Sequence, residues 1–329
     1  MQSKVGNLQV QLYEDWMKEM VSQLFIQEYK MELNAFVRLF ENFYEHPYQS
    51  KKSIRIVALD GKQVVGFQSF FYWPYEHNGK TINAYQSGNS LVHPEYRGQG
   101  IFQRLLHHID EYHEQLQVDC LVGFPIDVSV GSLLRNGWKN IFNLNWRIRI
   151  CNNLSVLRKF NPEKFANAMG SKSEHQSKPF TPFSKEKVKL NLTVDFIKWR
   201  SNYSNPAQYF TYSFSQGNGN IIFLLKINFR KRFIKELIIG NMIVEDEDAG
   251  ALSNAIQALC RAVSNSGQIS IISIGYNVSC NASLNAALER NKFKKIKNEI
   301  FFCVKPFNHV DTLMKPENWE VYRGDIDTW

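Results

Sequence analysis

The feature that most constrains this chain is a strand, a glycine turn and a helix that follow one another between residues 82 and 116. An apolar run from Ile82 to Val92 predicts a strand. Pro94 ends this strand, the turn Arg97-Gly98-Gln99-Gly100 follows, and an amphipathic helix is expected from Gly100 to Leu116. Glycines let the backbone approach a ligand closely, and the first amides of a helix have no internal acceptor. The turn therefore predicts an anion cradle that the helix dipole supports.

Two common phosphate-binding patterns do not fit this turn. A Walker loop would place Gly-Lys-Ser/Thr at the start of the helix, and a dinucleotide fingerprint would place G-x-G-x-x-G there. The turn instead resembles motif A of the GNAT superfamily of acyl-CoA-dependent N-acetyltransferases, which reads V-x-P-x-x-R/Q-x-x-G-x-G/A ahead of an apolar helix. Val92, Pro94, Arg97 and Gly100 match this motif, and Phe102 departs from it at the last position.

The resemblance implies a binding site for acetyl-CoA, which would be a co-substrate. In the family, the strand before the turn pairs with pantetheine, and the amides of the turn and of the first helical residues hold the pyrophosphate. The Arg97 side chain would add a charge-assisted bond to a phosphate, and Phe102 would narrow the approach. The residues that the resemblance implies are Ser90, Leu91, Val92, Arg97, Gly98, Gln99, Gly100, Ile101, Phe102 and Gln103.

The proton donor that the family often uses has no counterpart in this sequence. Acyl transfer needs an amine in its free-base form, an oxyanion stabiliser and a proton source for the leaving thiolate. The resemblance places the usual tyrosine four residues before the glycine of a Gly-aromatic pair. That pair is Gly137-Trp138 in this chain, and the tyrosine position is Leu133. The proton is therefore expected to come from solvent or from another donor.

Asp127 and Tyr85 are the candidate catalytic residues. Asp127 follows a buried strand predicted over 120–124, where it would act as a base or bind an acceptor hydroxyl. Its alternative role, which we favour, is to cap a short helix predicted over 129–136. Tyr85 alternates with Ser87 and Asn89 along its strand, so that one face would present these side chains to the acceptor. Ordinary sheet packing is the alternative for Tyr85.

The order of the other elements supports an α/β fold. Apolar residues at helical spacing run from Glu14 to Tyr44, and strands are expected over 54–59 and 64–73, joined by an Asp60-Gly61 turn. A further strand is expected over 144–150. The resemblance implies the GNAT fold, a central mixed sheet flanked by helices, in this part of the chain.

The C-terminal half repeats part of the N-terminal half. The segment Leu133–Ile141 aligns with Leu288–Ile296 at five identical positions, and each copy precedes a strand. Strands are expected over 221–227, 233–239, 240–244 and 301–304, and a helix over 249–263. We therefore expect a GNAT domain over 1–150, a connector over 151–187 and a second, degenerate GNAT-like lobe over 188–329. The acids Glu245–Asp248 replace the cradle there and would repel a pyrophosphate.

The composition restricts the classes of molecule that the protein is expected to bind. The net charge of +8 favours an anionic partner, but the basic residues are spread out, so we expect no nucleic acid. The aromatic segment 67–75 would serve equally well to stack on a sugar or to form a lobe interface.

No apolar run reaches membrane-spanning length, and no His or Cys pair has the spacing of a metal site. Five scattered cysteines indicate free thiols in a reducing cytoplasm. The oligomeric state stays open.

These observations predict an N-acetyltransferase that moves an acetyl group from acetyl-CoA to a small-molecule primary amine. An amino sugar or a nucleotide-linked amino sugar would suit the charge and the aromatic residues. The first alternative is a non-catalytic module that binds acyl-CoA, which the missing tyrosine favours. The second alternative is a tandem-GNAT aminoacyl transferase, against which the intact acyl-CoA cradle argues.

Overall fold

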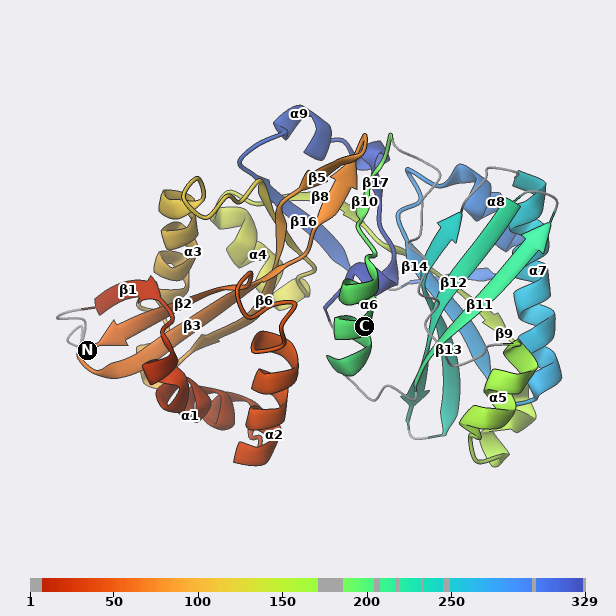
Figure 1. The fold of residues 1–329 in the computed structure, drawn as a ribbon, viewed down its shortest axis with the longest axis horizontal. Coiled ribbons are helices and arrows are strands. Elements are labelled where there is room, and N and C mark those ends of the chain that lie inside the picture. The colour runs from red at the N-terminus through yellow and green to blue at the C-terminus, as the bar shows by residue number, and fades with distance from the viewer. Residues whose placement is uncertain are drawn as a thin grey trace. The chain divides into compact units, whose positions relative to one another are not determined.

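The protein was analysed as a computed structural model, which describes residues 8–170, 186–203, 208–216, 219–231, 233–244, 249–297 and 300–327. The chain forms two compact units (Figure 1). Unit 1 comprises Met1–Tyr75, Thr81–Ile141 and Phe302–Met314. Unit 2 comprises Glu76–Lys80, Phe142–Phe301 and Lys315–Trp329. Each unit therefore draws on both halves of the sequence.

Unit 1 is built on a mixed seven-stranded sheet. Its order is β1 (Leu8–Leu12), β2 (Ile54–Asp60), β3 (Gln63–Tyr72), β6 (Ala84–Val92), β7 (Cys120–Gly123), β16 (Phe301–Pro306) and β8 (Lys139–Asn143). The pairs from β1 to β6 are antiparallel, β6 and β7 are parallel, and β7 and β16 are antiparallel. The sequence-based α/β prediction of a mixed sheet is confirmed.

Helices cover both faces of this sheet (Figure 1). One face holds η1 (Asp15–Met17), α1 (Lys18–Tyr29), α2 (Leu33–Leu39) and the π-helical turn η2 (Phe40–Tyr44). Phe25 from α1 packs edge-on against Phe67 of β3 at 5.3 Å. On the other face, α3 (Ile101–Tyr112) lies so close that a Cβ on Gly66 would come 2.7 Å from Ile101 Cγ2. The helical segment predicted over 14–44 is broken, because Lys30 adopts a left-handed conformation with φ 51°.

The predicted Asp60-Gly61 turn is present. Gly61, with φ 58°, closes the β2–β3 hairpin, and Asn78-Gly79 separates β4 (Tyr75–His77) from β5 (Lys80–Ile82). The strand predicted over 82–92 begins at Ala84, because Ile82 belongs to the separate short strand β5. A small sheet has the order β17 (Trp319–Glu320), β10 (Val188–Leu190), β4 and β5.

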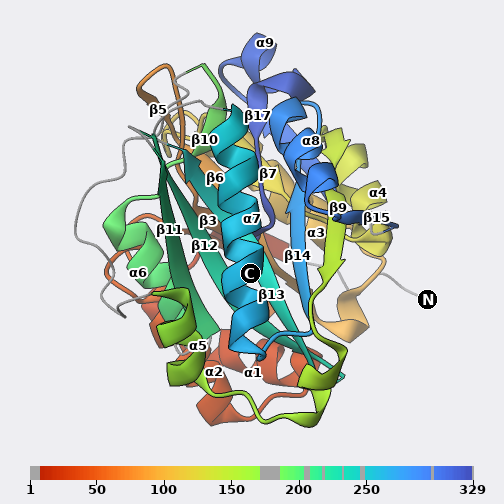
Figure 2. The same ribbon diagram turned by 90° about the vertical axis from the view of Figure 1, so that its right-hand side faces the viewer.

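Unit 2 has a six-stranded sheet. Its order is β11 (Tyr209–Gln216), β12 (Gly219–Arg230), β13 (Ile234–Val244), β14 (Ile271–Tyr276), β9 (Asn145–Ile150) and β15 (Lys294–Ile296). One face carries α7 (Ala249–Ser266), which runs along the sheet in Figure 2, with α5 (Pro162–Met169) and α8 (Ala282–Arg290). Ile197 of α6 (Val194–Tyr203) packs on the other face.

The two strands predicted over 233–239 and 240–244 are one strand. β13 continues through both segments, and its pairing with β12 shifts by one residue at Gly240. A bulge bends a strand without ending it, which explains the correction. The remaining short elements are η3 (Pro94–Tyr96), α4 (Asp127–Arg135), η4 (Asn153–Leu157), α9 (Val310–Leu313), η6 (Pro316–Asn318) and η7 (Arg323–Asp325).

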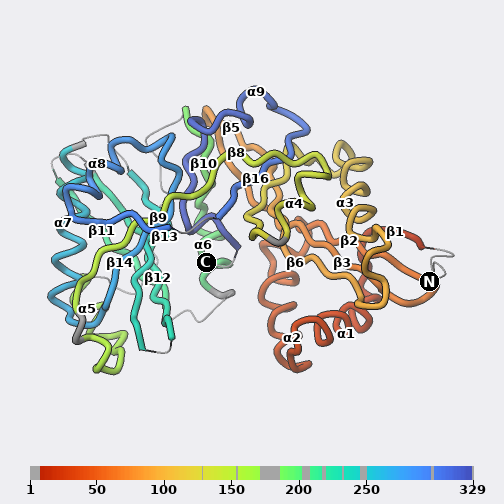
Figure 3. The backbone as a smooth tube through the Cα atoms, turned by 180° about the vertical axis from the view of Figure 1, so that it is seen from behind, coloured from red at the N-terminus to blue at the C-terminus, as the bar shows by residue number. Residues whose placement is uncertain are grey.

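The two units exchange a strand. β9 comes from the N-terminal half of the sequence and pairs with β14 and β15 in unit 2, whereas β16 comes from the C-terminal half and pairs with β7 in unit 1. Figure 3 shows the blue β16 beside orange and yellow elements. The sequence suggests the opposite allocation for both strands. The boundaries at residues 150 and 187 remain a prediction.

The sequence repeat has a structural counterpart in each unit. Asn136 and Asn291 occupy equivalent positions, and each donates through Nδ2 to the carbonyl four residues earlier, at 2.7 and 2.9 Å. A cation from the exchanged strand binds each asparagine's own carbonyl. Lys305 does so at 2.9 Å in unit 1, and Arg149 at 2.8 Å in unit 2.

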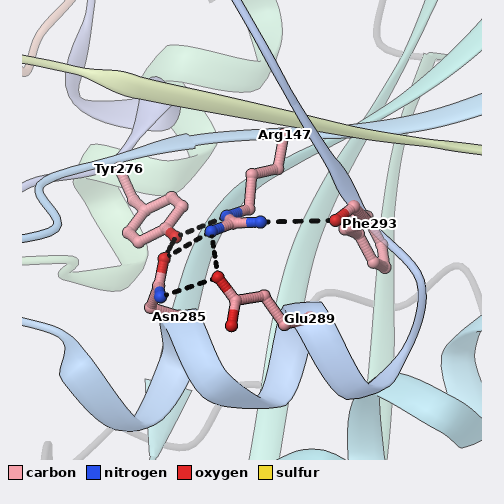
Figure 4. A network of polar contacts seen from close by, with 5 residues as sticks. All are labelled: Arg147, Tyr276, Asn285, Glu289 and Phe293. Atoms are coloured by element: carbon pink, nitrogen blue, oxygen red, sulfur yellow. Dashed lines mark hydrogen bonds and ion pairs between the residues drawn. The ribbon is translucent and has the colours of Figure 1, made fainter.

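Arg147 anchors the exchanged strand β9 within unit 2. Its guanidinium donates to Tyr276 Oη at 3.2 Å, to Asn285 Oδ1 at 2.8 Å and to Glu289 Oε1 at 2.7 Å (Figure 4). It also donates to the carbonyl of Phe293 at 3.3 Å. Because Arg147 is almost fully buried, these bonds satisfy a charge that would otherwise be costly. Within the described ranges we find no helix with the length and apolar content needed to cross a bilayer.

Candidate functional site

The glycine turn before α3 presents a row of backbone amides. Gly98 and Gly100 adopt left-handed conformations with φ 77° and 74°, and Gly100 is the N-cap of α3. Within the described residues, the amides of 98–103 donate to no backbone carbonyl, and the first amide of α3 that does so is that of Arg104, to Gly100 at 3.1 Å. A Cβ on Gly98 would meet nothing within 4 Å. The amides therefore form an open site suited to an anion.

Side chains hold this turn in place. Tyr96 is buried and donates to Asp60 Oδ2 at 2.7 Å, which ties the turn to the β2–β3 hairpin. Gln99 Nε2 donates to the Glu95 carbonyl at 3.1 Å. His93 accepts from the Glu95 amide at 3.4 Å and so caps η3. The cradle is thus preorganised by contacts within unit 1.

Next to the cradle, β6 separates from β7. The parallel pairing covers only Ala84, Tyr85 and Gln86, opposite residues 120–122. Beyond it the β3–β6 register shifts, because Ser69 of β3 faces both Gly88 and Asn89 of β6. Within the described residues, no strand pairs with the β7 side of β6 from Ser87 to Val92. This free edge includes the predicted residues Ser90, Leu91 and Val92.

A hydrogen-bond network fixes the bulge on one face. Tyr44 Oη donates to Asn89 Oδ1 at 2.6 Å and lies 3.0 Å from Ser69 Oγ. Asn89 Nδ2 in turn donates to Tyr29 Oη at 3.1 Å. The side chain of Asn89 is therefore bound by unit 1 itself. Since the bulge breaks the alternation of side chains, the expected common face of Tyr85, Ser87 and Asn89 is wrong.

The opposite face has its own network, centred on Gln68. Gln68 Nε2 donates to the Ser69 carbonyl at 2.7 Å and to Ser87 Oγ at 3.2 Å. Ser90 Oγ donates to Gln68 Oε1 at 2.5 Å. The side chains of Ser87 and Ser90 are thereby turned toward β3, so the backbone of β6 is the part left free at its edge.

Arg97 lies at the cradle, but its guanidinium is already engaged. Nε donates to the Val92 carbonyl at 3.2 Å, and Nη2 forms an ion pair with Glu28 of α1. The pair is partly exposed, so its contribution to stability is small and a phosphate would compete with Glu28. Ile101 is buried, Phe102 is half-buried and Gln103 is exposed. The structure thus brings the residues that are predicted to bind acetyl-CoA into one turn and one strand edge.

The sequence comparison assigns this part of the chain. Residues 14–140 match the family model described as an acetyltransferase (GNAT) domain, and they include the free strand edge and the cradle. Residues 14–140 form a GNAT domain. The domain belongs to a family of acyltransferases. No curated protein sequence matches the chain.

Solved structures share the fold of the whole chain. A GCN5-related N-acetyltransferase from Anabaena variabilis gives a TM-score of 0.58 at 14% identity, covering 91% of this chain and 72% of that one. A second, from Kribbella flavida, gives 0.58 at 12% identity, with 91% and 71% covered. Saccharomyces cerevisiae N-myristoyltransferase with bound myristoyl-CoA gives 0.50 at 11% identity, with 99% and 86% covered. At these identities the similarity concerns the fold.

In the GNAT domain, Asp127 does not cap a helix that starts at Ser129. α4 begins at Asp127 itself, its N-cap is Ile126, and no side chain caps it. Asp127 is exposed in the first turn, where a carboxylate is favoured by the helix dipole. It lies four residues beyond the end of β7, and a role as base or acceptor ligand stays a prediction. Leu133 is buried and lies near Gly123 and Trp138, so it belongs to the core.

Tyr85 is nearly buried in the GNAT domain. Its ring packs edge-on against Tyr72 at 5.5 Å. Burial raises the pKa of Tyr85 to about 12, and Tyr72 and Asp119 add to the effect. The phenol therefore stays protonated at neutral pH, which disfavours it as a base. Its role in catalysis remains a prediction.

The aromatic segment 67–75 mostly serves the core. Phe70, Phe71, Trp73 and Tyr75 are completely buried, and only Tyr72 in this group keeps partial exposure. Phe71 packs against Phe43 at 4.2 Å. These buried rings offer no face on which a sugar could stack.

Sequence reasoning did not single out Gln86 or Tyr44. Tyr44 sits at the end of a helical pattern like any core aromatic, so nothing in the sequence marks its bond to the bulge. Gln86 is one of several polar residues in the segment 82–92, so the sequence does not distinguish it from its neighbours. The described residues contain no group of three or more His, Cys, Asp or Glu side chains placed to hold a metal ion. All five cysteines are free thiols.

In unit 2, as between β6 and β7 of unit 1, a bulged strand separates from its parallel neighbour and leaves an opening between the two strands. A segment of the same chain fills this opening in unit 2. β13 and β14 pair in parallel up to Ile239, and the bulge at Gly240 follows. Tyr322 forms a bridge with Tyr276 at the end of β14. Gly324 packs so tightly that a Cβ there would lie 2.8 Å from the carbonyl carbon of Gly240. The acids Glu245–Asp248, expected to replace the cradle, lie outside the described residues.

Proposed function

We propose that this protein transfers an acetyl group from acetyl-CoA to a primary amine. The observation that carries the proposal is the adjacency of two unused backbone surfaces, the amides of 98–103 and the free edge of β6. The first suits a pyrophosphate and the second suits an extended chain that hydrogen-bonds like a strand. Pantetheine diphosphate carries both features, with amides in its arm and charge at its base.

The proposed reaction forms one bond and breaks one. The amine nitrogen attacks the thioester carbon, a C–N bond forms, the C–S bond breaks, and CoA leaves as a thiolate that takes up a proton. The amine loses one proton, so a shuttle to the thiolate balances the step. Because Leu133 is a buried apolar residue, this proton passes through solvent or through Asp127. Asp127 is exposed and within the GNAT domain, which suits it to accept a proton from the amine.

An amino sugar or a nucleotide-linked amino sugar is the acceptor to test first. The net charge of +8 supports an anionic acceptor such as a sugar nucleotide. The buried aromatic segment gives this choice no further support. Acyl length needs the same test, since the N-myristoyltransferase of similar fold was solved with myristoyl-CoA.

Titration calorimetry with acetyl-CoA tests the donor site. We expect one site, and we expect Gly100→Glu to weaken binding at least 100-fold. Gly100 has φ 74°, and a carboxylate beside the cradle amides would repel a pyrophosphate. Parallel titrations with longer acyl-CoA chains define the acyl length. A wild-type protein that binds no acyl-CoA, or a Gly100→Glu variant that binds as well as wild type, would contradict the proposal.

A non-catalytic acyl-CoA-binding module is the second candidate function. The burial of Leu133 at the tyrosine position favours it, because the GNAT domain then lacks the usual acid. Release of CoA from acetyl-CoA, measured with a panel of amines, separates the two. A transferase releases CoA with at least one amine, and a binding module releases none.

A further inference from the structure

Gln86 lies at the point where the opening beside β6 closes. It is the last residue of β6 that pairs with β7, opposite Val122. The free edge of β6 runs from there to the cradle, and Val92 is six residues away. At 3.3 Å per residue this is about 20 Å of strand. A chain that starts at the cradle and follows the edge therefore ends beside Gln86.

The carboxamide of Gln86 is buried without a hydrogen bond. The residue is completely buried, and neither Nε2 nor Oε1 has a partner in the described part of the chain. Buried polar groups almost always have partners, and leaving one unpaired costs the full desolvation penalty. The contrast with Gln68 on the neighbouring strand is direct. Gln68 is equally buried, and both ends of its amide are hydrogen-bonded.

The register places Gln86 on the face of the sheet away from α3. Gln86 faces Phe71 across the β3–β6 pair, so both side chains lie on the same face. Phe71 packs against Phe43 and Tyr44 of η2. The glycine against which α3 packs, Gly66, belongs to the other face. Gln86 therefore lies at the end of the opening, on the sheet face opposite to α3.

The corresponding place in unit 2 is apolar. Two residues before the bulge glycine, β6 has Gln86 and β13 has Ile238, which is buried among apolar side chains. The opening of unit 2 is filled by the chain itself. In the filled opening the amide nitrogen of Asn241 is bound to Asp325, whereas in the free opening neither end of the Gln86 amide has a partner among the described residues.

We propose that Gln86 binds the acceptor amine next to the acyl group, an assignment that rests on the proposed transferase function. Oε1 accepts an N–H of the amine, and Nε2 donates to the thioester oxygen. With Nε2 bound to the thioester oxygen, Oε1 is left to accept one N–H of the amine and so to hold its nitrogen near the acyl carbon. Gln86 would then position a primary amine beside the acyl group.

Gln86→Met tests the proposal, because methionine keeps the unbranched shape and removes both polar atoms. Ser273→Ala is the matched control. Ser273 is also completely buried with an unpaired side-chain oxygen, but it lies in β14 of unit 2. Three quantities are measured for both variants: the melting temperature, the Kd for acetyl-CoA, and CoA release with ethylamine and glucosamine as probe amines.

We expect Gln86→Met to melt at the same or a higher temperature and to bind acetyl-CoA within twofold of wild type. Its kcat/KM for the probe amine should fall at least 30-fold, and Ser273→Ala should leave this value unchanged. An unchanged kcat/KM in Gln86→Met would overturn the proposal and leave the transferase function standing. A fall in acetyl-CoA affinity that accounts for the whole loss would also overturn it. Wild-type protein that binds acetyl-CoA but releases none with any amine would refute both the role of Gln86 and the transfer activity.

Discussion

Each unit contains a bulged strand that separates from its parallel neighbour, and an opening lies between the two strands. The two openings differ in what occupies them. In unit 2 the segment from Val321 to Asp325 lies in the opening, and Asn277 donates its amide to the Val321 carbonyl at 3.0 Å. In unit 1 no described segment pairs with the free edge of β6. One opening is therefore closed by a covalently attached peptide, and the other is left for a separate molecule.

The difference extends to the residues that line each opening. Asn241, next to the bulge in β13, donates to Asp325 Oδ1 at 2.6 Å, so its amide is used to hold the C-terminal segment. Asn89, next to the bulge in β6, is used to hold the strand itself through Tyr44. A bulge and a separating strand pair therefore do not by themselves define a ligand site. What defines it is the polar backbone that remains unpaired.

The largest expected effect is the loss of stability after a substitution in the filled opening of unit 2. A Cβ on Gly324 would lie 1.8 Å from Asn241 Oδ1 and 2.8 Å from the backbone of Gly240, and that backbone cannot move aside. We expect Gly324→Val to lower the free energy of unfolding by about 3 kcal/mol. Gly98→Ala in the open unit should cost only about 1 kcal/mol, from its backbone conformation. Urea unfolding of both variants checks this, and equal losses would contradict the contrast between the openings.

A second effect concerns Asp325, which sits in the filled opening. Burial raises its pKa to about 8, although the bond from Asn241 opposes the shift. The folded protein therefore binds this proton more tightly than the unfolded chain, whose carboxyl has an ordinary pKa of 3.8. The stability that the protonated carboxyl contributes is complete below about pH 4 and is lost as the pH rises through about 8.

Asp325→Asn removes this titration and keeps the shape of the side chain. Compared with wild type, the variant should gain at least about 1 kcal/mol of stability between pH 5 and pH 8.5. Urea unfolding of both proteins at the two pH values measures the change, and other titrating groups cancel in the difference. A difference in stability that is the same at both pH values would show that Asp325 is ionised in the folded protein.

The smallest expected effect is a change in the affinity for acetyl-CoA at the open site of unit 1. Glu28→Gln should release Arg97 for a phosphate and tighten acetyl-CoA binding about twofold to threefold, because a partly exposed ion pair is worth well under 1 kcal/mol. Glu45→Gln is the control. Glu45 forms a comparable partly exposed pair with Lys18 at 2.7 Å, away from the cradle. Calorimetry should show no change for the control, and tightening by both variants would point to a general charge effect.

The parts of the site that depend on local sequence could be predicted. The cradle is encoded by Gly98 and Gly100 followed by a helix, and the hairpin by Asp60-Gly61, since both need particular backbone conformations from adjacent residues. The repeat around Asn136 and Asn291 was visible because its turn needs the same residues twice.

What depends on distant pairing could not be predicted. Neither the alternating sequence of β9 nor the apolar run of β16 indicates which neighbouring strand it pairs with. Phe67 and Phe71 are buried because α1 and η2 cover them, which spacing alone does not reveal. The unpaired state of Gln86 depends on every side chain around it.

The exchange of β9 and β16 also governs how the protein can be made and divided. β7, an interior strand of the unit 1 sheet, gains its second neighbour only when residues 301–306 have been synthesised. Until then the emerging N-terminal half exposes an unpaired strand edge, the kind of surface that leads to aggregation. A fragment cut at residue 150 would keep that edge permanently and would carry β9 without its partners β14 and β15. Neither half of the sequence contains a complete sheet, because the sheet of unit 1 includes a strand encoded some 160 residues beyond the region 14–140 that matches the family model.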